Sequence, residues 1–141
     1  MKRLTQLLAQ RKGGVYRWQG KMVRANRRDA TAPAIVSIDV PDTKQALLER
    51  LATDLALPEW FGHNWDALED CLAELPQAEG RGVVIELRHL GGLAAHDPDS
   101  VRTLLDILRD AAVDWSVRGG FLLVLAEGAG RLAGDIEPAG E

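Results

Sequence analysis

Residues 121–126, which read FLLVLA, restrict the fold more than any other segment, because six consecutive positions carry no polar side chain. Such a run is typical of a strand that is covered on both faces, as in a parallel sheet. Two further strands are predicted, over residues 34–40 and 83–87. Both are rich in β-branched residues, and the first lies between Pro33 and Pro41.

Two helices are predicted between the first and second of these strands. Asp42, with Gln45 three positions later, forms a variant of the capping box, and apolar residues then recur on one helical face until Pro58 ends the pattern. A second helix is predicted over residues 64–75, and Pro76 ends it.

A third helix is predicted between the last two strands. Asp97-Pro98 favours a helix start there, because the carboxylate can cap the first turn and the missing proline N–H costs nothing. Gly91-Gly92 predicts a turn before it. This order of elements predicts an α/β fold with a small three-stranded, mostly parallel sheet packed with helices.

The charges are unevenly distributed along the 141 residues. Residues 1–28 carry nine Lys or Arg and no acidic side chain, whereas residues 29–141 carry the other eight basic side chains and all 21 acidic ones. We expect a basic N-terminal extension over residues 1–33 with one short strand, a domain over 34–127, and a disordered tail over 128–141. The extension is compatible with a nucleic-acid contact or with an arm that folds back on the acidic body, and that body favours basic partners.

A single cysteine, Cys71, leaves no internal disulfide to form, so a reduced cytoplasm is the expected compartment. The apolar stretch near the N-terminus is interrupted by Thr5 and Gln6, unlike a signal peptide. No segment approaches the roughly 20 apolar residues of a membrane helix, so we expect no membrane contact.

Residues 51–80 contain seven acidic side chains and neither Lys nor Arg. On the helix predicted at 64–75, the acidic residues fall within an arc of about 140°, and the apolar residues fill the opposite arc. Four carboxylates and one alanine share the charged arc: Asp66, Glu69, Asp70, Ala73 and Glu74.

Like charges at positions i and i+4 on this helix repel each other by a few tenths of a kcal/mol in water. No Lys or Arg stands three or four residues away to neutralise them. Two interpretations remain open: a plain solvated helix face, or a surface whose carboxylates are relieved by a cationic partner through charge-assisted hydrogen bonds.

Aromatic residues precede this helix. Trp60 and Phe61 lie on a loop, where Gly62 offers a flexible or positive-φ turn, and Trp65 is expected in the core. Packing under the loop is favoured for Phe61, whereas Trp60 fits a packed position and an interface hot spot equally well.

The segment LALPEWFGHNWDALEDCL, residues 55–72, resembles the signature of the barstar family, the intracellular inhibitors of secreted microbial ribonucleases. The family pattern is Leu-Pro, two aromatics, Gly, Asn and then Asp-Ala-Leu and Asp-Cys-Leu. With the order of strands and helices, the resemblance covers residues 34–127. It implies an inhibitor that blocks a basic active site with an acidic helix face.

The resemblance also implies roles for individual residues. Asp70 matches the aspartate that enters the ribonuclease active site, and Asp66 matches a second interface aspartate. Gly62 and Asn64 match the glycine and asparagine of the loop. Trp60 stands where the family has a tyrosine, Glu69 stands where it has a tryptophan, and Asp110 matches a glutamate late in the third helix. The predicted contact set is Trp60, Gly62, Asn64, Asp66, Glu69, Asp70, Ala73 and Asp110.

Other functions compete with this interpretation. The target is expected to be a basic extracellular-type ribonuclease or a related toxin. A barstar-like binding module that acts as an immunity protein against another basic protein or toxin fits the sequence too. His63, Asp66 and Asp70 can be written as a metal site, although they lack the ligand count of a recognisable motif. We expect no enzymatic activity, no cofactor and no metal. Cys71 lies on the apolar arc, where it resembles a small buried hydrophobe rather than a nucleophile.

Overall fold

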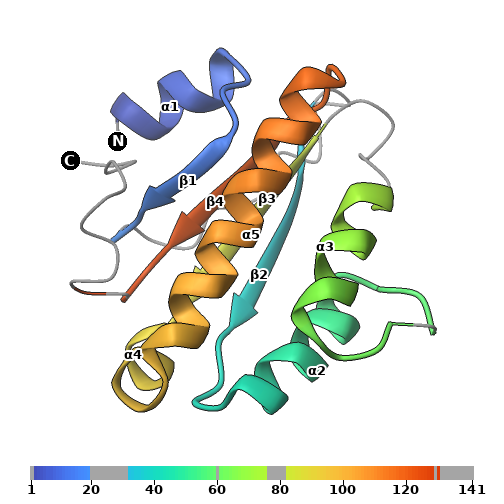
Figure 1. The fold of residues 1–141 in the computed structure, drawn as a ribbon. Helices are drawn as coiled ribbons and strands as arrows, with labels where there is room; N and C mark the ends of the chain where they lie inside the picture. The colour runs from blue at the N-terminus through green and yellow to red at the C-terminus, as the bar shows by residue number, and fades with distance from the viewer. Residues whose placement is uncertain (1, 20–31, 60, 76–81, 129, 131–141) are drawn as a thin grey trace.

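Four parallel strands form one sheet in the order β1-β4-β3-β2 (Figure 1). The computed structural model describes residues 2–19, 32–59, 61–75, 82–128 and 130. The strands are β1 (Gly14–Arg17), β2 (Ala34–Asp39), β3 (Val83–Arg88) and β4 (Leu122–Ala126). The helices are α1 (Lys2–Ala9), α2 (Lys44–Asp54), α3 (Trp65–Glu74), α4 (Gly91–His96) and α5 (Pro98–Val117).

The apolar segment at 121–126 provides a central strand, as predicted. β4 lies between β1 and β3, and all five of its residues are buried. Leu122 and Val124 belong to the core on one face of the sheet, and Leu123 and Leu125 belong to the core on the other. The two-residue period of a strand sends alternate side chains to opposite faces, so a strand covered on both faces is apolar throughout.

The larger core lies between the sheet and α2, α3, α4 and α5, with α5 running along the sheet in Figure 1. The helices contribute their apolar stripes to this core, among them Leu48 of α2, Leu72 of α3 and Leu104 of α5. Trp115 on α5 is fully buried, and its indole nitrogen donates a hydrogen bond to the carbonyl oxygen of Leu72 at 3.1 Å. This bond fixes α5 beside the last turn of α3.

A second, smaller core covers the opposite face of the sheet. Leu7 of α1 and Tyr16 of β1 pack there with Trp18 and with side chains of β3 and β4. Glu86 on β3 points to the same side and is fully buried. Its carboxylate accepts hydrogen bonds from the Trp18 indole nitrogen at 3.0 Å and the Ser37 hydroxyl at 2.8 Å, and Arg88 lies 3.4 Å away.

The predicted α/β class with a parallel sheet packed with helices is confirmed, but the sheet has four strands rather than three. β1 pairs in parallel with β4, with Gly14 opposite Leu123. The expected short strand near residue 15 is therefore part of the main sheet. The sequence around β1 does not identify β4 as its partner, because the two strands are more than 100 residues apart.

Two local predictions about helix starts are wrong. Thr43, not Asp42, caps α2: its side chain accepts a hydrogen bond from the Ala46 N–H at 3.2 Å. The Asp42 carboxylate instead occupies the space beside Gly92, where any side chain would collide with it. Gly91-Gly92 is not a turn but the first two residues of α4.

The chain turns before Gly91, at His89, whose φ is 64°. The Glu127 side chain accepts a hydrogen bond from the His89 N–H at 2.7 Å, and the Glu127 carbonyl oxygen accepts one from the Leu90 N–H at 3.0 Å. The bend is thus held by a residue that follows β4, which the local sequence could not indicate. The predicted tail at 128–141 lies almost entirely outside the described residues.

Candidate functional site: the acidic face of α3 and its groove with α5

The loop before α3 is anchored by Phe61, which is buried as predicted and whose N–H donates to the Pro58 carbonyl oxygen at 2.9 Å. Gly62 was expected to offer a flexible or positive-φ turn, but its φ is not positive, and the left-handed residue is His63, with φ of 54°. The space beside Gly62 is tight. A Cβ there would lie 3.1 Å from the Asn64 amide nitrogen. Trp60, a predicted contact residue, lies outside the described residues.

Asn64 caps α3 and shapes the loop at the same time. Its side-chain oxygen accepts a hydrogen bond from the Ala67 N–H at 2.8 Å, and its amide nitrogen donates to the Gly62 carbonyl oxygen at 3.3 Å. The predicted helix over 64–75 is confirmed as Trp65–Glu74, with Asn64 and Leu75 as its caps. Two predicted contact residues, Gly62 and Asn64, are thereby held together at the start of the helix.

The two arcs predicted for this helix are confirmed. Leu68, Cys71 and Leu72 are buried. Trp65 is only partly buried against the core, with the Lys44 ammonium 5.5 Å from its ring centre. The five exposed positions of the helix form what we call the acid face: Asp66, Glu69, Asp70, Ala73 and Glu74.

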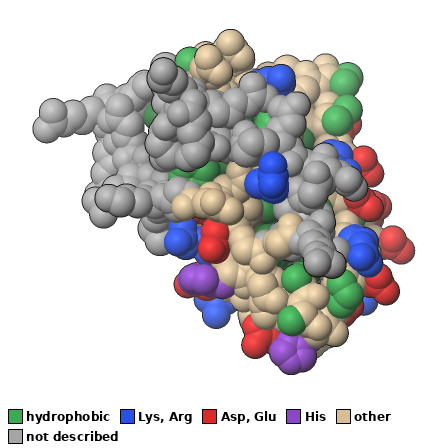
Figure 2. Space-filling model, turned by 90° about the vertical axis from the view of Figure 1, so that its left-hand side faces the viewer, with side chains coloured by type: hydrophobic (Ala, Val, Ile, Leu, Met, Phe, Trp, Pro, Cys, Tyr) green, Lys and Arg blue, Asp and Glu red, His purple; other side chains and the backbone are tan. Residues whose placement is uncertain are grey.

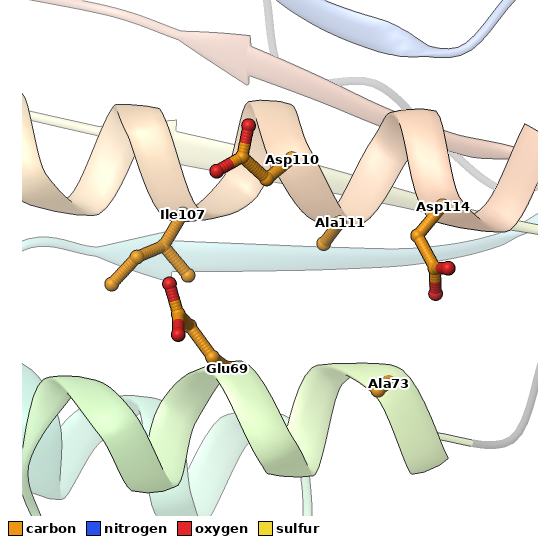
Figure 3. A pocket seen from close by; sticks show the side chains of 6 residues that line it. All are labelled: Glu69, Ala73, Ile107, Asp110, Ala111 and Asp114. Atoms are coloured by element: carbon orange, nitrogen blue, oxygen red, sulfur yellow. The ribbon is translucent and has the colours of Figure 1, made fainter.

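A groove of about 360 Å³ separates the acid face from α5. The two helices run side by side, so Glu69 lies across from Ile107 and Ala73 lies across from Ala111 (Figure 3). The structure therefore brings together three of the predicted contact residues, Glu69, Ala73 and Asp110, on one groove. In Figure 3 the Glu69 side chain extends toward α5, whereas the Asp110 carboxylate is turned away from α3.

Asp114 also lines this groove and was missed by the sequence analysis. Its side chain extends from α5 toward α3 (Figure 3), and its carboxylate pairs with Arg118 at 2.9 Å. The available signal was its position one turn after Asp110, which places both on neighbouring parts of the helix surface.

Acidic side chains on α5 and on α3 differ in their partners. On α5, Asp99, Asp106 and Asp114 each form an ion pair with an arginine three or four residues later. Acidic and basic side chains also lie close together along one edge of the face drawn in Figure 2. Among the described residues, no ion pair includes a carboxylate of the acid face or that of Asp110. Within the described ranges, these exposed carboxylates therefore have no cationic partner.

Cys71 lies directly beneath the acid face. Burial raises the pKa of its thiol, and the nearby carboxylates of Glu74 and Asp70 raise it further. The reactive thiolate is therefore disfavoured, as predicted for a buried small hydrophobe rather than a nucleophile.

The proposed metal ligands His63, Asp66 and Asp70 do not form a metal site. Within the part of the chain that the structure describes, no group of three or more His, Cys, Asp or Glu side chains could hold a metal ion. His89, which follows β3, lies with its Nδ1 3.0 Å from the Asp39 carboxylate at the end of β2. None of the helices in the described ranges is both long and apolar enough to cross a membrane.

Comparison with known proteins identifies the scaffold that carries this site. The family model described as Barstar (barnase inhibitor) matches residues 33–127, a segment that contains β2, β3, β4, the helices α2 to α5 and the whole groove. No curated protein matches the chain. The matched segment is more than half of the 141 residues, and it includes the loop and helix whose sequence resembles the family signature. The chain belongs to the barstar family.

Proposed function

We propose that this protein inhibits a small basic ribonuclease of the extracellular microbial type by docking its acid face in the enzyme's active site. Family membership supports this target class, since the family is described by its inhibition of barnase. The observation that carries the proposal is the acid face itself: exposed carboxylates one turn apart, without an ion pair among the described residues.

The chemistry follows from what a ribonuclease active site must contain. Arg and Lys side chains that hold the phosphate of RNA are equally good donors to a carboxylate, and these bonds strengthen when water is excluded. Asp70, near the middle of α3, enters the site and takes the place of a phosphate. Asp66 accepts a second cation one turn earlier.

The other predicted contacts surround these two aspartates. Gly62 and Asn64 stand on the loop side of α3, and Trp60 precedes them in the sequence. Glu69, Ala73 and Asp110 extend the contact toward α5. The acidic body also raises the rate of encounter with a basic enzyme, and this steering weakens as salt rises. An inhibitor of this kind protects the cell's own RNA, which places its work in the cytoplasm.

Inhibition can be tested by titration. The purified protein is added to a small basic microbial ribonuclease that cleaves a fluorogenic RNA substrate, and we expect activity to fall to zero near a 1:1 ratio. The Asp70→Asn variant should need a large molar excess over the ribonuclease to reach the same inhibition. Asp99→Asn is the matched control, because it removes the same charge from the first turn of α5, where Asp99 already pairs with Arg102. A protein that inhibits none of several such enzymes would overturn the proposal.

A second candidate is a basic toxin of a different activity. Glu69 favours it, because a carboxylate stands on the groove where the family resemblance implies a tryptophan. Tight binding to a basic protein that has no ribonuclease activity, lost in Asp70→Asn, would support this candidate over the first.

A further inference from the structure

Two exposed valines on α5 have no role in the fold. Val113 and Val117 are 61% and 81% exposed, and they are the large hydrophobic side chains that remain exposed in the described parts of the chain. Single exposed apolar residues are ordinary on protein surfaces. These two stand four residues apart, so they are neighbours on the helix surface and form one apolar stripe.

The valine stripe adjoins Asp110, whose carboxylate enters no ion pair among the described residues. Asp110 is seven residues before Val117, which places the two within about 20° of each other around the helix, and Val113 lies about 60° from Asp110. Figure 3 shows the Asp110 carboxylate turned away from α3, toward the outer side of α5. The neighbouring acids Asp106 and Asp114 are both paired with arginines. The stripe therefore offers apolar surface beside a carboxylate that can still accept a cation.

The size of the acid face argues that a partner must contact more than α3. An α-helix of ten residues is about 15 Å long, so its exposed side is far smaller than the roughly 800 Å² that each partner buries in a typical specific complex. The α3–α5 groove and the outer side of α5 are adjacent surfaces available to the same partner. Interfaces of this kind place apolar contacts beside charged ones.

We propose that the interface with the basic ribonuclease extends across the α3–α5 groove to the Val113–Val117 stripe. The enzyme presents an Arg or Lys there, with its head group on Asp110 and its aliphatic stem on the valines. The surface combines an acidic and an apolar part, and a long basic side chain of the enzyme matches both. Its cationic end pairs with Asp110, and its apolar alkyl part contacts the valines. The inference rests on the proposed function and adds a second, partly apolar contact to it.

The test compares the double variant V113A/V117A with the wild type. Dissociation from an immobilised small basic ribonuclease, one that the wild type inhibits, is followed by surface plasmon resonance. We expect the dissociation rate constant to rise about tenfold, equivalent to about 1.4 kcal/mol, with little change in the association rate constant. The variant should remain folded, because alanine favours a helix more than valine does. Thr53→Ala, which truncates an exposed β-branched residue on α2, is the control and should change neither rate.

The outcomes separate the two proposals. If Asp70→Asn weakens binding and V113A/V117A dissociates within twofold of the wild type, the extended contact is wrong and the proposed function stands. If the wild type binds no ribonuclease, both are wrong. A concentration-dependent dimer of the wild type in analytical ultracentrifugation, absent in V113A/V117A, would assign the stripe to a second copy of the chain and overturn the inference.

Discussion

The carboxylates on the two sides of the sheet differ in burial and in pairing. Glu86 is fully buried on the α1 side, where it accepts hydrogen bonds from Trp18 and Ser37. Asp66 and Asp70 are exposed on the α3 side and enter no ion pair among the described residues. A buried carboxylate needs partners within the fold, whereas an exposed one is solvated by water and stays accessible to another molecule. Removing the first should damage stability, and removing the second should damage binding.

Glu86→Ala should have the largest effect on stability. It leaves the Trp18 indole N–H and the Ser37 hydroxyl without their acceptor in the smaller core, and the free energy of unfolding should fall by about 3 kcal/mol. Urea denaturation followed by circular dichroism measures this loss. Glu74→Ala, a matched truncation on the acid face, should leave stability nearly unchanged. A loss of equal size in both variants would contradict the comparison.

Asn64→Ala should have an intermediate effect, because Asn64 joins the acid face to the fold. Loss of its cap bond to Ala67 should lower the free energy of unfolding by about 1 kcal/mol. Asn64→Ser keeps a capping oxygen and should retain most of that stability in the same denaturation experiment. If Asn64→Ser lowers the free energy of unfolding as much as Asn64→Ala does, the cap bond does not account for the loss.

Asp70→Asn should raise stability slightly while it weakens binding. The substitution removes the repulsion of Asp70 with Asp66 and with Glu74, each one turn away, and the gain should be about 0.5 kcal/mol. The same variant should weaken ribonuclease binding by about 2 kcal/mol or more, as expected for a central charged contact. Thermal unfolding and inhibition are measured on one preparation. If the variant is less stable than the wild type, Asp70 has a structural role instead.

Asp97 is a partly buried acid with a structural role, and its substitution should produce the smallest effect. Hydrogen bonds from the side chain and the backbone N–H of Ser100 lower the pKa of its carboxyl, with a further contribution from the charge of Lys44. A lowered pKa stabilises the fold above the ordinary pKa of aspartate, and this contribution is lost as pH falls through the lowered value. Asp97→Asn should therefore show a flatter loss of stability below about pH 4 than the wild type. Identical pH profiles of the melting temperature would contradict this.

Local sequence patterns were sufficient to predict the core strands and the acid face. An apolar run identifies β4 because burial on both faces leaves no polar position, and Asn64 marks the start of α3 because its side chain bonds to a backbone N–H only three residues away. The charged arc of α3 follows directly from the helical repeat.

Features that depend on distant segments could not be predicted in this way. The bend at His89 is held by Glu127, and the Trp18–Glu86 bond joins two residues that are 68 positions apart in the sequence. The position of Asp114 one turn after Asp110 was a signal in the sequence, but its place opposite α3 was not, because the α3–α5 groove depends on the relative position of two helices. The positive φ considered for Gly62 belongs to His63, and the tight contact of Gly62 with the amide of Asn64 depends on how the loop folds.

The parallel pairing of β1 with β4 also has a consequence for how the protein is made. Gly14 and Leu123 are register partners, and ribosomes add roughly 5–20 residues per second, so β1 emerges on the order of ten seconds before its partner strand exists. During that interval Val15, Tyr16 and Trp18 have no sheet to pack against. Contacts between such distant segments also slow folding. β1 is therefore among the last strands of this sheet to be paired, and its apolar side chains stay exposed until β4 has been synthesised.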